Sequence, residues 1–106
     1  MRIYKIFRLT EWRDLEARKQ TEGSPDDRRD GFMHFSREEQ LEGTLAKHFA
    51  GEGDLMLAAC EGDAFGEALK WENGFPHLYR SLSREDVVWH AEIPPEGIDR
   101  MTLGQG

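Results

Sequence analysis

Cysteine, proline and long apolar runs are scarce in this chain of 106 residues, which has the length of one compact domain. Its single cysteine, Cys60, has no partner for an internal disulfide bond, which favours a reducing compartment. The longest apolar run, from Leu55 to Cys60, is far shorter than the roughly 20 residues needed to cross a membrane. We therefore expect a cytoplasmic protein with no membrane partner.

Positive charge is also scarce, because 14 Lys and Arg residues stand against 21 Asp and Glu residues and give a net charge of −7. A nucleic-acid-binding protein needs a basic face that neutralises phosphates, so this balance argues against a nucleic-acid partner. Aromatic residues are well represented, with six Phe, three Trp and two Tyr. That content is typical of a folded core and not of a disordered chain.

Several motifs that identify common enzyme classes are missing. The chain has no Gly-x-Gly-x-x-Gly, Gly-x-x-x-x-Gly-Lys or Gly-x-Ser-x-Gly sequence, so a Rossmann domain, a P-loop enzyme and an α/β-hydrolase lose their main support. The four histidines, His34, His48, His77 and His90, show neither His-x-His nor His-x-x-x-His spacing. We therefore expect no metal site, and a metal-dependent enzyme is the weakest of three functional hypotheses.

Residue periodicity predicts a single α+β domain over residues 1–93, followed by an irregular tail over 94–106. One helix is expected from a Thr10 cap to about residue 19, and a second from a Ser36 capping box to a stop at Gly51. Strands are predicted over 3–9, 31–35, 54–60, 69–72, 75–79 and 87–93. This order favours a split, mostly antiparallel sheet with two main helices.

Two segments share a pattern that could carry chemistry, Phe-Met-His-Phe-Ser at 32–36 and Phe-Pro-His-Leu-Tyr at 75–79. On an extended strand, His34 and His77 each share a face with the first aromatic residue and the last, hydroxyl-bearing residue of their segment. Such an imidazole can bind a ligand by stacking and hydrogen bonding, or move a proton near neutral pH. The alternative is that both histidines are structural and bond the backbone of a half-buried sheet.

A carboxylate follows a tryptophan in the predicted strand over 69–72, where Glu72 comes after Trp71. Beside an indole, a carboxylate can lose water and have its pKa raised, which suits acid–base chemistry. Equally, Glu72 can be a solvated strand residue next to a core tryptophan.

Together these segments resemble the domain-of-unknown-function 952 family of small, mostly bacterial proteins, and the resemblance covers about residues 2–93. The residues that carry it are Ile3-Tyr4-Lys5-Ile6, Asp30-Gly31-Phe32-Met33-His34-Phe35-Ser36, Gln40, His48-Phe49, Leu69-Lys70-Trp71-Glu72 and Phe75-Pro76-His77-Leu78-Tyr79. The fold of that family is considered similar to the ADP-ribosyltransferases, which bind NAD in a cleft between two small sheets. The resemblance therefore implies an ADP-ribosylation-type fold with NAD as a substrate.

The resemblance also implies roles for particular residues. Tyr4 or Lys5 matches the polar residue that those transferases carry on their first strand, and His34 matches the residue on the strand that leads into a helix. Their third position, usually a glutamate, falls here on His77, with Glu72 as a nearby substitute. We expect His34 to contact the ribose or diphosphate, His77 to act as an acid–base or orienting group, and Glu72 to assist. A histidine in place of the glutamate argues against ordinary protein mono-ADP-ribosylation.

The remaining contacts that the resemblance implies are polar and aromatic. Ser36 is a candidate polar contact, and Tyr4, Trp71 and Tyr79 are candidate aromatic walls. Lys5 is a candidate diphosphate ligand, together with two arginines of the polar segment 20–30, which is expected to be a loop: Arg28 and Arg29. The second functional hypothesis is a non-catalytic binding or protein-interaction module that kept the scaffold without the chemistry.

Overall fold

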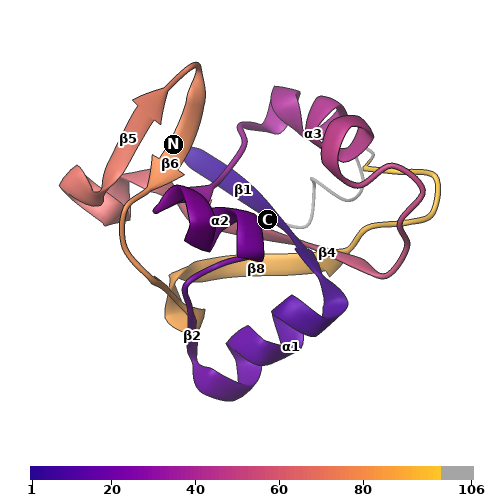
Figure 1. Cartoon of the computed structure of the whole chain (residues 1–106), viewed down its shortest axis with the longest axis horizontal. Coiled ribbons are helices and arrows are strands. Elements are labelled where there is room, and N and C mark those ends of the chain that lie inside the picture. Colours follow the sequence, from indigo (N-terminus) through magenta and orange to yellow (C-terminus); the bar gives the residue numbers. More distant parts are fainter. Residues whose placement is uncertain (99–106) are drawn as a thin grey trace.

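The computed structural model describes residues 1–98 (Figure 1). Its strands are β1 (Arg2–Arg8), β2 (Gln20–Thr21), β3 (Met33–His34), β4 (Leu55–Glu61), β5 (Leu69–Glu72), β6 (Phe75–Leu78), β7 (Leu82–Ser83) and β8 (Val87–Glu92). Its α-helices are α1 (Leu9–Arg18), α2 (Pro25–Asp30) and α3 (Leu41–His48), and 3₁₀ turns cover Glu38–Gln40, Gly62–Ala68 and Arg84–Asp86.

The strands form three small antiparallel sheets, with the orders β1-β4-β8, β2-β7 and β3-β6-β5. This confirms the predicted α+β class and the split, antiparallel arrangement. The first and third sheets are joined at one isolated bridge, where the backbones of Tyr4 and Ser36 exchange two hydrogen bonds of 2.8 Å. Beyond this bridge β1 and β3 have no further pairing, so β1 keeps a free edge.

Strand β4 is the centre of the first sheet, and its six apolar residues 55–60 are all buried. A continuous apolar run is expected for a strand that is covered on both faces. Ile3 and Phe7 of β1 pack into one core cluster with α1 and the third sheet. Tyr4 and Ile6, on the other face of β1, pack with α3. Strand β1 is therefore fixed between two cores.

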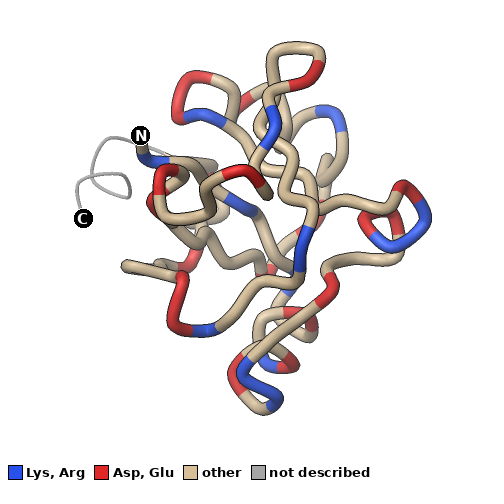
Figure 2. Tube along the Cα trace, turned by 90° about the vertical axis from the view of Figure 1, so that its left-hand side faces the viewer, with Lys and Arg blue, Asp and Glu red and all other residues tan. Residues whose placement is uncertain are grey.

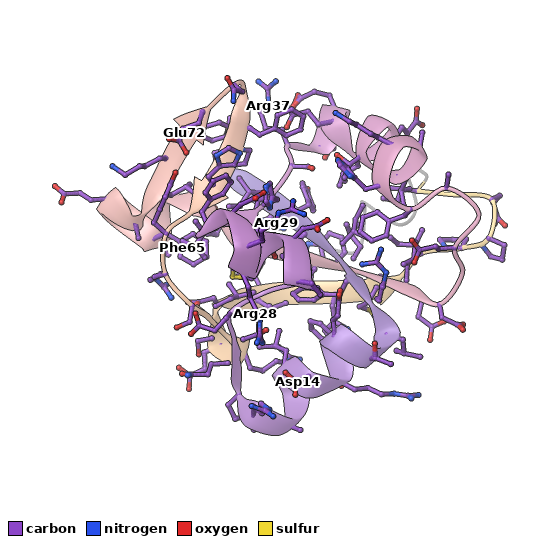
Figure 3. All side chains as sticks on the ribbon, in the orientation of Figure 1. Asp14, Arg28, Arg29, Arg37, Phe65 and Glu72 are labelled. Carbon is purple, nitrogen blue, oxygen red and sulfur yellow. The ribbon has the colours of Figure 1, made fainter. Side chains whose placement is uncertain are left out.

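The polar segment 20–30, predicted to be a loop, instead contains β2 and α2. Helix α2 begins after Ser24, whose hydroxyl accepts the Asp27 N–H, and it ends at Gly31, which has a φ of 84°. The six residues of α2 carry no apolar periodicity, because Asp27 is its only buried residue. The two arginines of α2, Arg28 and Arg29, leave the helix in different directions (Figure 3).

Two predicted helix starts also need correction. Helix α1 begins at Leu9, so Thr10 lies inside its first turn, and the Glu11 carboxylate caps the Arg8 N–H at 2.9 Å. Ser36 does not cap the following helix, because its hydroxyl bonds Thr44. The start of the 3₁₀ turn that leads into α3 is capped instead by Gln40, whose side-chain oxygen accepts the N–H of Arg37 at 2.8 Å.

The C-terminal segment predicted to be an irregular tail is described only in part. Residues 94–98 contain no helix or strand, and Ile98 is buried beside β1 and β4. Residues 99–106 lie outside the described part of the chain. Within the described part, no helix is long and apolar enough to cross a membrane. Acidic and basic residues are interspersed along the described trace (Figure 2).

Candidate functional site

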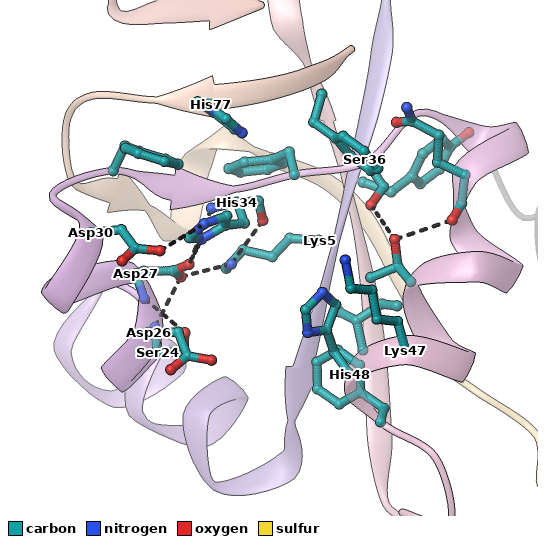
Figure 4. Close-up of a pocket in the computed structure, with 18 of the residues that line it drawn as sticks. Lys5, Ser24, Asp26, Asp27, Asp30, His34, Ser36, Lys47, His48 and His77 are labelled. Atoms are coloured by element: carbon teal, nitrogen blue, oxygen red, sulfur yellow. Dashed lines mark hydrogen bonds and ion pairs between the residues drawn. The ribbon is translucent and has the colours of Figure 1, made fainter. Parts of the chain in front are cut away.

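A cavity of about 730 Å³ opens along the free edge of β1, between α2 on one side and α3 on the other (Figure 4). It exists because β1 and β3 pair only at the Tyr4–Ser36 bridge, which leaves a fork between the two sheets. Ligand pockets in proteins typically have volumes of roughly 300–1,000 Å³. The fork is therefore large enough for a ligand of substantial size.

His34 and His77 are directly opposite each other on neighbouring strands, because the register of β3 and β6 pairs them. Both line the cavity, and their ring centroids are 5.6 Å apart. Phe32 also lines the cavity, and its ring centroid lies 4.1 Å from the His77 ring and 4.7 Å from the His34 ring. The two histidine segments therefore form one aromatic surface and are not packed apart in the core.

A buried carboxylate holds His34 in place. The Asp27 side chain is 2% exposed and lies beneath His34, whose Nδ1–H donates to it at 2.6 Å (Figure 4). The backbone N–H of His34 donates to the same carboxylate oxygen at 3.1 Å. On its other side, His34 Nε2 lies 3.2 Å from an oxygen of Asp30. Both carboxylates come from α2, so this short helix fixes the orientation of the imidazole.

The charge of Asp27 is balanced inside the protein by Lys5 of β1. The Lys5 ammonium is 6% exposed, lies 2.7 Å from the second Asp27 oxygen and donates to the His34 carbonyl at 2.9 Å. Burial alone would raise the pKa of the Asp27 carboxyl, but the charge and hydrogen bond of Lys5 and the hydrogen bond from His34 outweigh it and hold this pKa below its usual value. Lys5 is thus bound internally and does not present its charge to the cavity.

His77 is held by a second carboxylate, which comes from the neighbouring strand β5. Its Nδ1–H donates to Glu72 at 2.8 Å, and the hydroxyl of Tyr79 donates to the same oxygen at 2.6 Å. Hydrogen bonds from Tyr79 and then His77 lower the pKa of Glu72, and the bond to Glu72 raises the pKa of Tyr79. Of the two interpretations of Glu72, the desolvated carboxylate with a raised pKa is wrong, because Trp71 points to the opposite face of the strand and does not cover it. Glu72 is a solvated strand residue, although the tryptophan beside it is exposed and not part of the core.

Two further predicted contacts, Tyr4 and Ser36, line the cavity but already have protein partners. The Tyr4 hydroxyl lies 3.4 Å from a Glu38 oxygen, and burial, followed by the charge of Glu38, raises the pKa of Tyr4. The Ser36 hydroxyl shares a hydrogen bond of 2.9 Å with Thr44 of α3. At the closed end of the fork, Tyr4 therefore joins β1 to the 3₁₀ turn Glu38–Gln40, and Ser36 joins the segment after β3 to α3.

The predicted aromatic walls Trp71 and Tyr79 do not line this cavity. Trp71 is 47% exposed and faces away from His77, because residues 70 and 72 share the face of His77 while residue 71 does not. Tyr79 packs on Phe32 at a centroid distance of 5.2 Å and lines a smaller neighbouring cavity. The aromatic lining is supplied by Tyr4, by Phe32 and Phe75 of the two histidine segments, and by Phe35 and Phe49.

The expected cationic contacts are also distributed differently. Arg28 lines the smaller cavity and does not reach the larger one. Arg29 lines the larger cavity but lies within 3.2 Å of Asp26 and 3.1 Å of Asp30. Lys47 and His48, which were not predicted as ligand contacts, line the cavity from α3.

The site can orient imidazoles and offers them a cavity, but it shows no metal centre. Each Nδ1–H of the histidine pair donates to a carboxylate. Nε2 of His34 also faces a carboxylate, that of Asp30, so His77 is the member of the pair whose Nε2 is left for a ligand. Nε2 of His77 makes no hydrogen bond within residues 1–98. No group of three or more His, Cys, Asp or Glu side chains suited to a metal ion occurs in the same residues.

Cys60 does not contribute to this chemistry. Its side chain is fully buried in β4, and burial raises the pKa of its thiol to about 12. A nucleophilic cysteine needs a stabilised thiolate, so Cys60 is a core residue.

Sequence reasoning missed two parts of the site, Asp27 and the pair Lys47 and His48. Asp27 could have been found from the Ser24-Pro25 pair before it, which is typical of a helix start, and from its position three residues after Ser24. Lys47 and His48 give no such signal, because basic residues are common in the last turn of any helix.

Comparisons with known proteins agree on a family. A family model described as a protein of unknown function (DUF952) matches residues 6–90. The crystal structure of protein CC0527 from Caulobacter crescentus is 40% identical in sequence, with 98% of this chain and 97% of that chain covered and a TM-score of 0.87. Its solution NMR structure is 39% identical, with 99% and 97% covered and a TM-score of 0.79. No curated protein matches this chain.

Proposed function

The chain belongs to the DUF952 family of unknown function, and we propose that its cavity binds NAD or a related ADP-ribose-containing nucleotide. The observation that carries the proposal is the pairing of His34 with His77 in one cavity, each held at Nδ1 by a carboxylate. Histidines that only stabilise the fold do not need to face a cavity, and two such histidines do not both need a carboxylate partner at Nδ1. An oriented pair beside an open volume is the arrangement expected where a ligand is bound and a proton is moved.

The lining of the cavity supports a nucleotide in two further ways. Phe32 and Phe75 offer aromatic surface beside the histidines, on which a purine or pyridine ring can stack. Lys47 of α3 places a positive charge on one wall and pairs with no carboxylate within residues 1–98, in a chain whose net charge is −7. A ligand with flat rings at its ends and anionic groups between them matches this distribution.

Transfer of the ADP-ribose group is the reaction that such a complex would support. The bond between C1′ of the ribose and the nicotinamide nitrogen breaks, and its electron pair leaves on neutral nicotinamide. An acceptor hydroxyl, with water as the simplest case, forms the new bond to C1′. The proton of that hydroxyl passes to Nε2 of His77, which Glu72 orients through Nδ1. Release of free nicotinamide from NAD is the measurable product.

The experiment is a thermal-shift titration of the protein with NAD, ADP-ribose and nicotinamide. A ligand present at about 100 times its dissociation constant stabilises the fold by roughly 2.7 kcal/mol, which is a shift of several degrees for a domain of this size. The same titration is run on His34→Ala and His77→Ala, each compared with its own unliganded midpoint. The matched control is His90→Ala, because His90 is exposed on β8 and does not line the cavity.

We expect NAD or ADP-ribose to shift the wild-type protein and the His90 variant, and both cavity variants to lose most of that shift. If the His34 and His77 variants fold and shift as the wild type does, the histidine pair is not part of a nucleotide site. If none of the three ligands shifts the wild-type protein, the proposal is wrong.

A protein-interaction module is the second candidate, and the hairpin β5–β6 is the observation that favours it. Strand β5 is an edge strand, and Trp71 on it is 47% exposed. Large exposed aromatic residues and open strand edges are typical contact features. Sedimentation velocity at rising protein concentration tests the simplest case, in which the partner is a second copy of this chain. Self-association that Trp71→Ser removes would support the candidate, and a monomer at every concentration would contradict self-association through this edge.

A further inference from the structure

One face of α3, extended by Gln40 at the end of the preceding 3₁₀ turn, is polar yet faces the cavity. Its members follow helical spacing, i, i+3, i+4, i+7 and i+8, and all of them line the cavity: Gln40, Gly43, Thr44, Lys47 and His48. We call this set the α3 stripe. The neighbouring face of the same helix carries Leu41 and Leu45, which pack into the core. The stripe is therefore held in place by the core and cannot turn away from the cavity.

Two members of the α3 stripe use their polar groups inside the protein. Gln40 accepts the Arg37 N–H at 2.8 Å and donates to the Gly74 carbonyl at 2.8 Å, which ties α3 to the β5–β6 turn. Thr44 donates to the Gln40 carbonyl at 3.1 Å and bonds Ser36. These residues fix the wall and leave little capacity for a ligand.

Lys47 and His48 are the members whose polar groups have no such partner within residues 1–98. In residues 1–98, the other Lys and Arg side chains that line the cavity all lie beside carboxylates: Lys5 beside Asp27, Arg8 beside Glu52, and Arg29 beside Asp26 and Asp30. Lys47 makes no ion pair within the same residues. Figure 4 shows Lys47 and His48 reaching into the cavity from α3, across from the cluster of Lys5 and His34.

The remaining member, Gly43, leaves room in front of this wall. Glycine inside a helix is unfavourable, so it needs a reason there. A Cβ built at Gly43 would meet no atom within 4 Å, so close helix packing is not that reason. The missing side chain enlarges the cavity one turn before Lys47. Helix-dipole stabilisation accounts for a basic last turn, but it accounts for neither the direction of Lys47 and His48 nor the glycine.

We infer that the α3 stripe is an anion subsite, which binds the phosphate or diphosphate group of the ligand through Lys47 and His48 over the space left by Gly43. This inference rests on the proposed function for the rest of the ligand, and it replaces Lys5, Arg28 and Arg29 as the diphosphate contacts. A lysine ammonium binds phosphate as a point charge without needing a fixed geometry, which suits an exposed helix end.

The test is isothermal titration of the full chain with ADP-ribose, adenosine and inorganic pyrophosphate, at two salt concentrations. The variants are Lys47→Gln, the double variant Lys47→Gln/His48→Gln, and Gly43→Leu, which fills the space in front of the wall. The matched control is Lys70→Gln, which removes a lysine of β5 that does not line the cavity.

We expect Lys47→Gln to weaken ADP-ribose binding about tenfold and the double variant to weaken it further, while adenosine, which has no phosphate, binds as before. The salt dependence of ADP-ribose binding should fall in the same variants. Gly43→Leu should abolish ADP-ribose binding, and Lys70→Gln should leave it unchanged.

The outcomes separate this inference from the proposed function. If ADP-ribose binds and the α3 variants bind it as tightly as the wild type does, the anion subsite is wrong and the nucleotide cavity remains. If pyrophosphate binds and depends on Lys47 while no nucleotide binds, the anion subsite is supported and the proposed function fails. If neither pyrophosphate nor any nucleotide binds, both are overturned.

Discussion

At the residue scale, Asp27 connects more of the molecule than any predicted site residue. Its carboxylate accepts from the Lys5 ammonium of β1, the Ser24 N–H at the start of α2 and both the backbone and ring N–H of His34 on β3. One side chain thus joins three elements and fixes the imidazole that faces the cavity. A buried charge pair of this kind is costly to break, because the remaining charge has no water around it.

We predict that Asp27→Asn lowers the free energy of unfolding by roughly 3–5 kcal/mol, because the Lys5 ammonium would stay buried without a counter-charge. Urea unfolding followed by tryptophan fluorescence measures the change. The control is Asp26→Asn, since Asp26 is 68% exposed and pairs with the exposed Arg29, so its loss should change stability by no more than about 0.5 kcal/mol. Equal unfolding midpoints for the two variants would show that the buried pair is not what stabilises this region.

At the element scale, Gly43 lowers the stability of α3, but it leaves the space in the cavity that the proposed anion subsite uses. We predict that Gly43→Ala stabilises the fold by about 0.5–1 kcal/mol and raises the melting temperature by several degrees, because alanine is the better helix former and the space is open. The matched variant is Gly51→Ala, which should destabilise, because Gly51 has a φ of 76° and alanine is strained there. Calorimetry of both variants measures the effect. A lower melting temperature for Gly43→Ala would mean that this glycine has a structural reason of its own.

The elements that could be predicted are those with a repeating apolar pattern. The six apolar residues 55–60 indicate a strand covered on both faces, and Trp12 and Leu15 indicate the inner face of α1. Helix α2 could not be found in this way, because its sequence, Pro-Asp-Asp-Arg-Arg-Asp, buries only Asp27. A helix that is held by one buried carboxylate and a capped start has no periodic signal.

Only those parts of the site that a short sequence motif determines could be predicted. The likeness of the segments at 32–36 and 75–79 pointed to His34 and His77, but their pairing depends on the register of β3 and β6, which no local pattern sets. Strand alternation could have separated Trp71 from Glu72, because successive side chains face opposite ways. The partners of Lys5 could not have been foreseen, since its charge is balanced by a helix that the sequence did not indicate.

At the scale of the whole molecule, charge is dispersed and negative in sum. The net charge is −7, and short acidic and basic patches are scattered along the trace (Figure 2). Many of the ion pairs join exposed side chains, which contribute little to stability. Within residues 1–98, Lys5–Asp27 is the ion pair in which both side chains are buried. The response of the whole fold to acid should therefore depend strongly on this one pair.

We predict that acid removes the stability contributed by Asp27 as the pH falls below about 4. The pKa of its carboxyl is lowered in the folded protein, so the folded state favours the ionised form more than the unfolded chain does. That contribution is complete above the unfolded pKa of about 3.9 and is lost as the pH falls through the lower, folded pKa. The measurement is the melting temperature of the wild type and of Asp27→Asn between pH 7 and pH 2.5. The difference between them should be constant above about pH 5 and shrink below pH 4, whereas a difference that persists at pH 2.5 would show that the charge of Asp27 does not set the acid response.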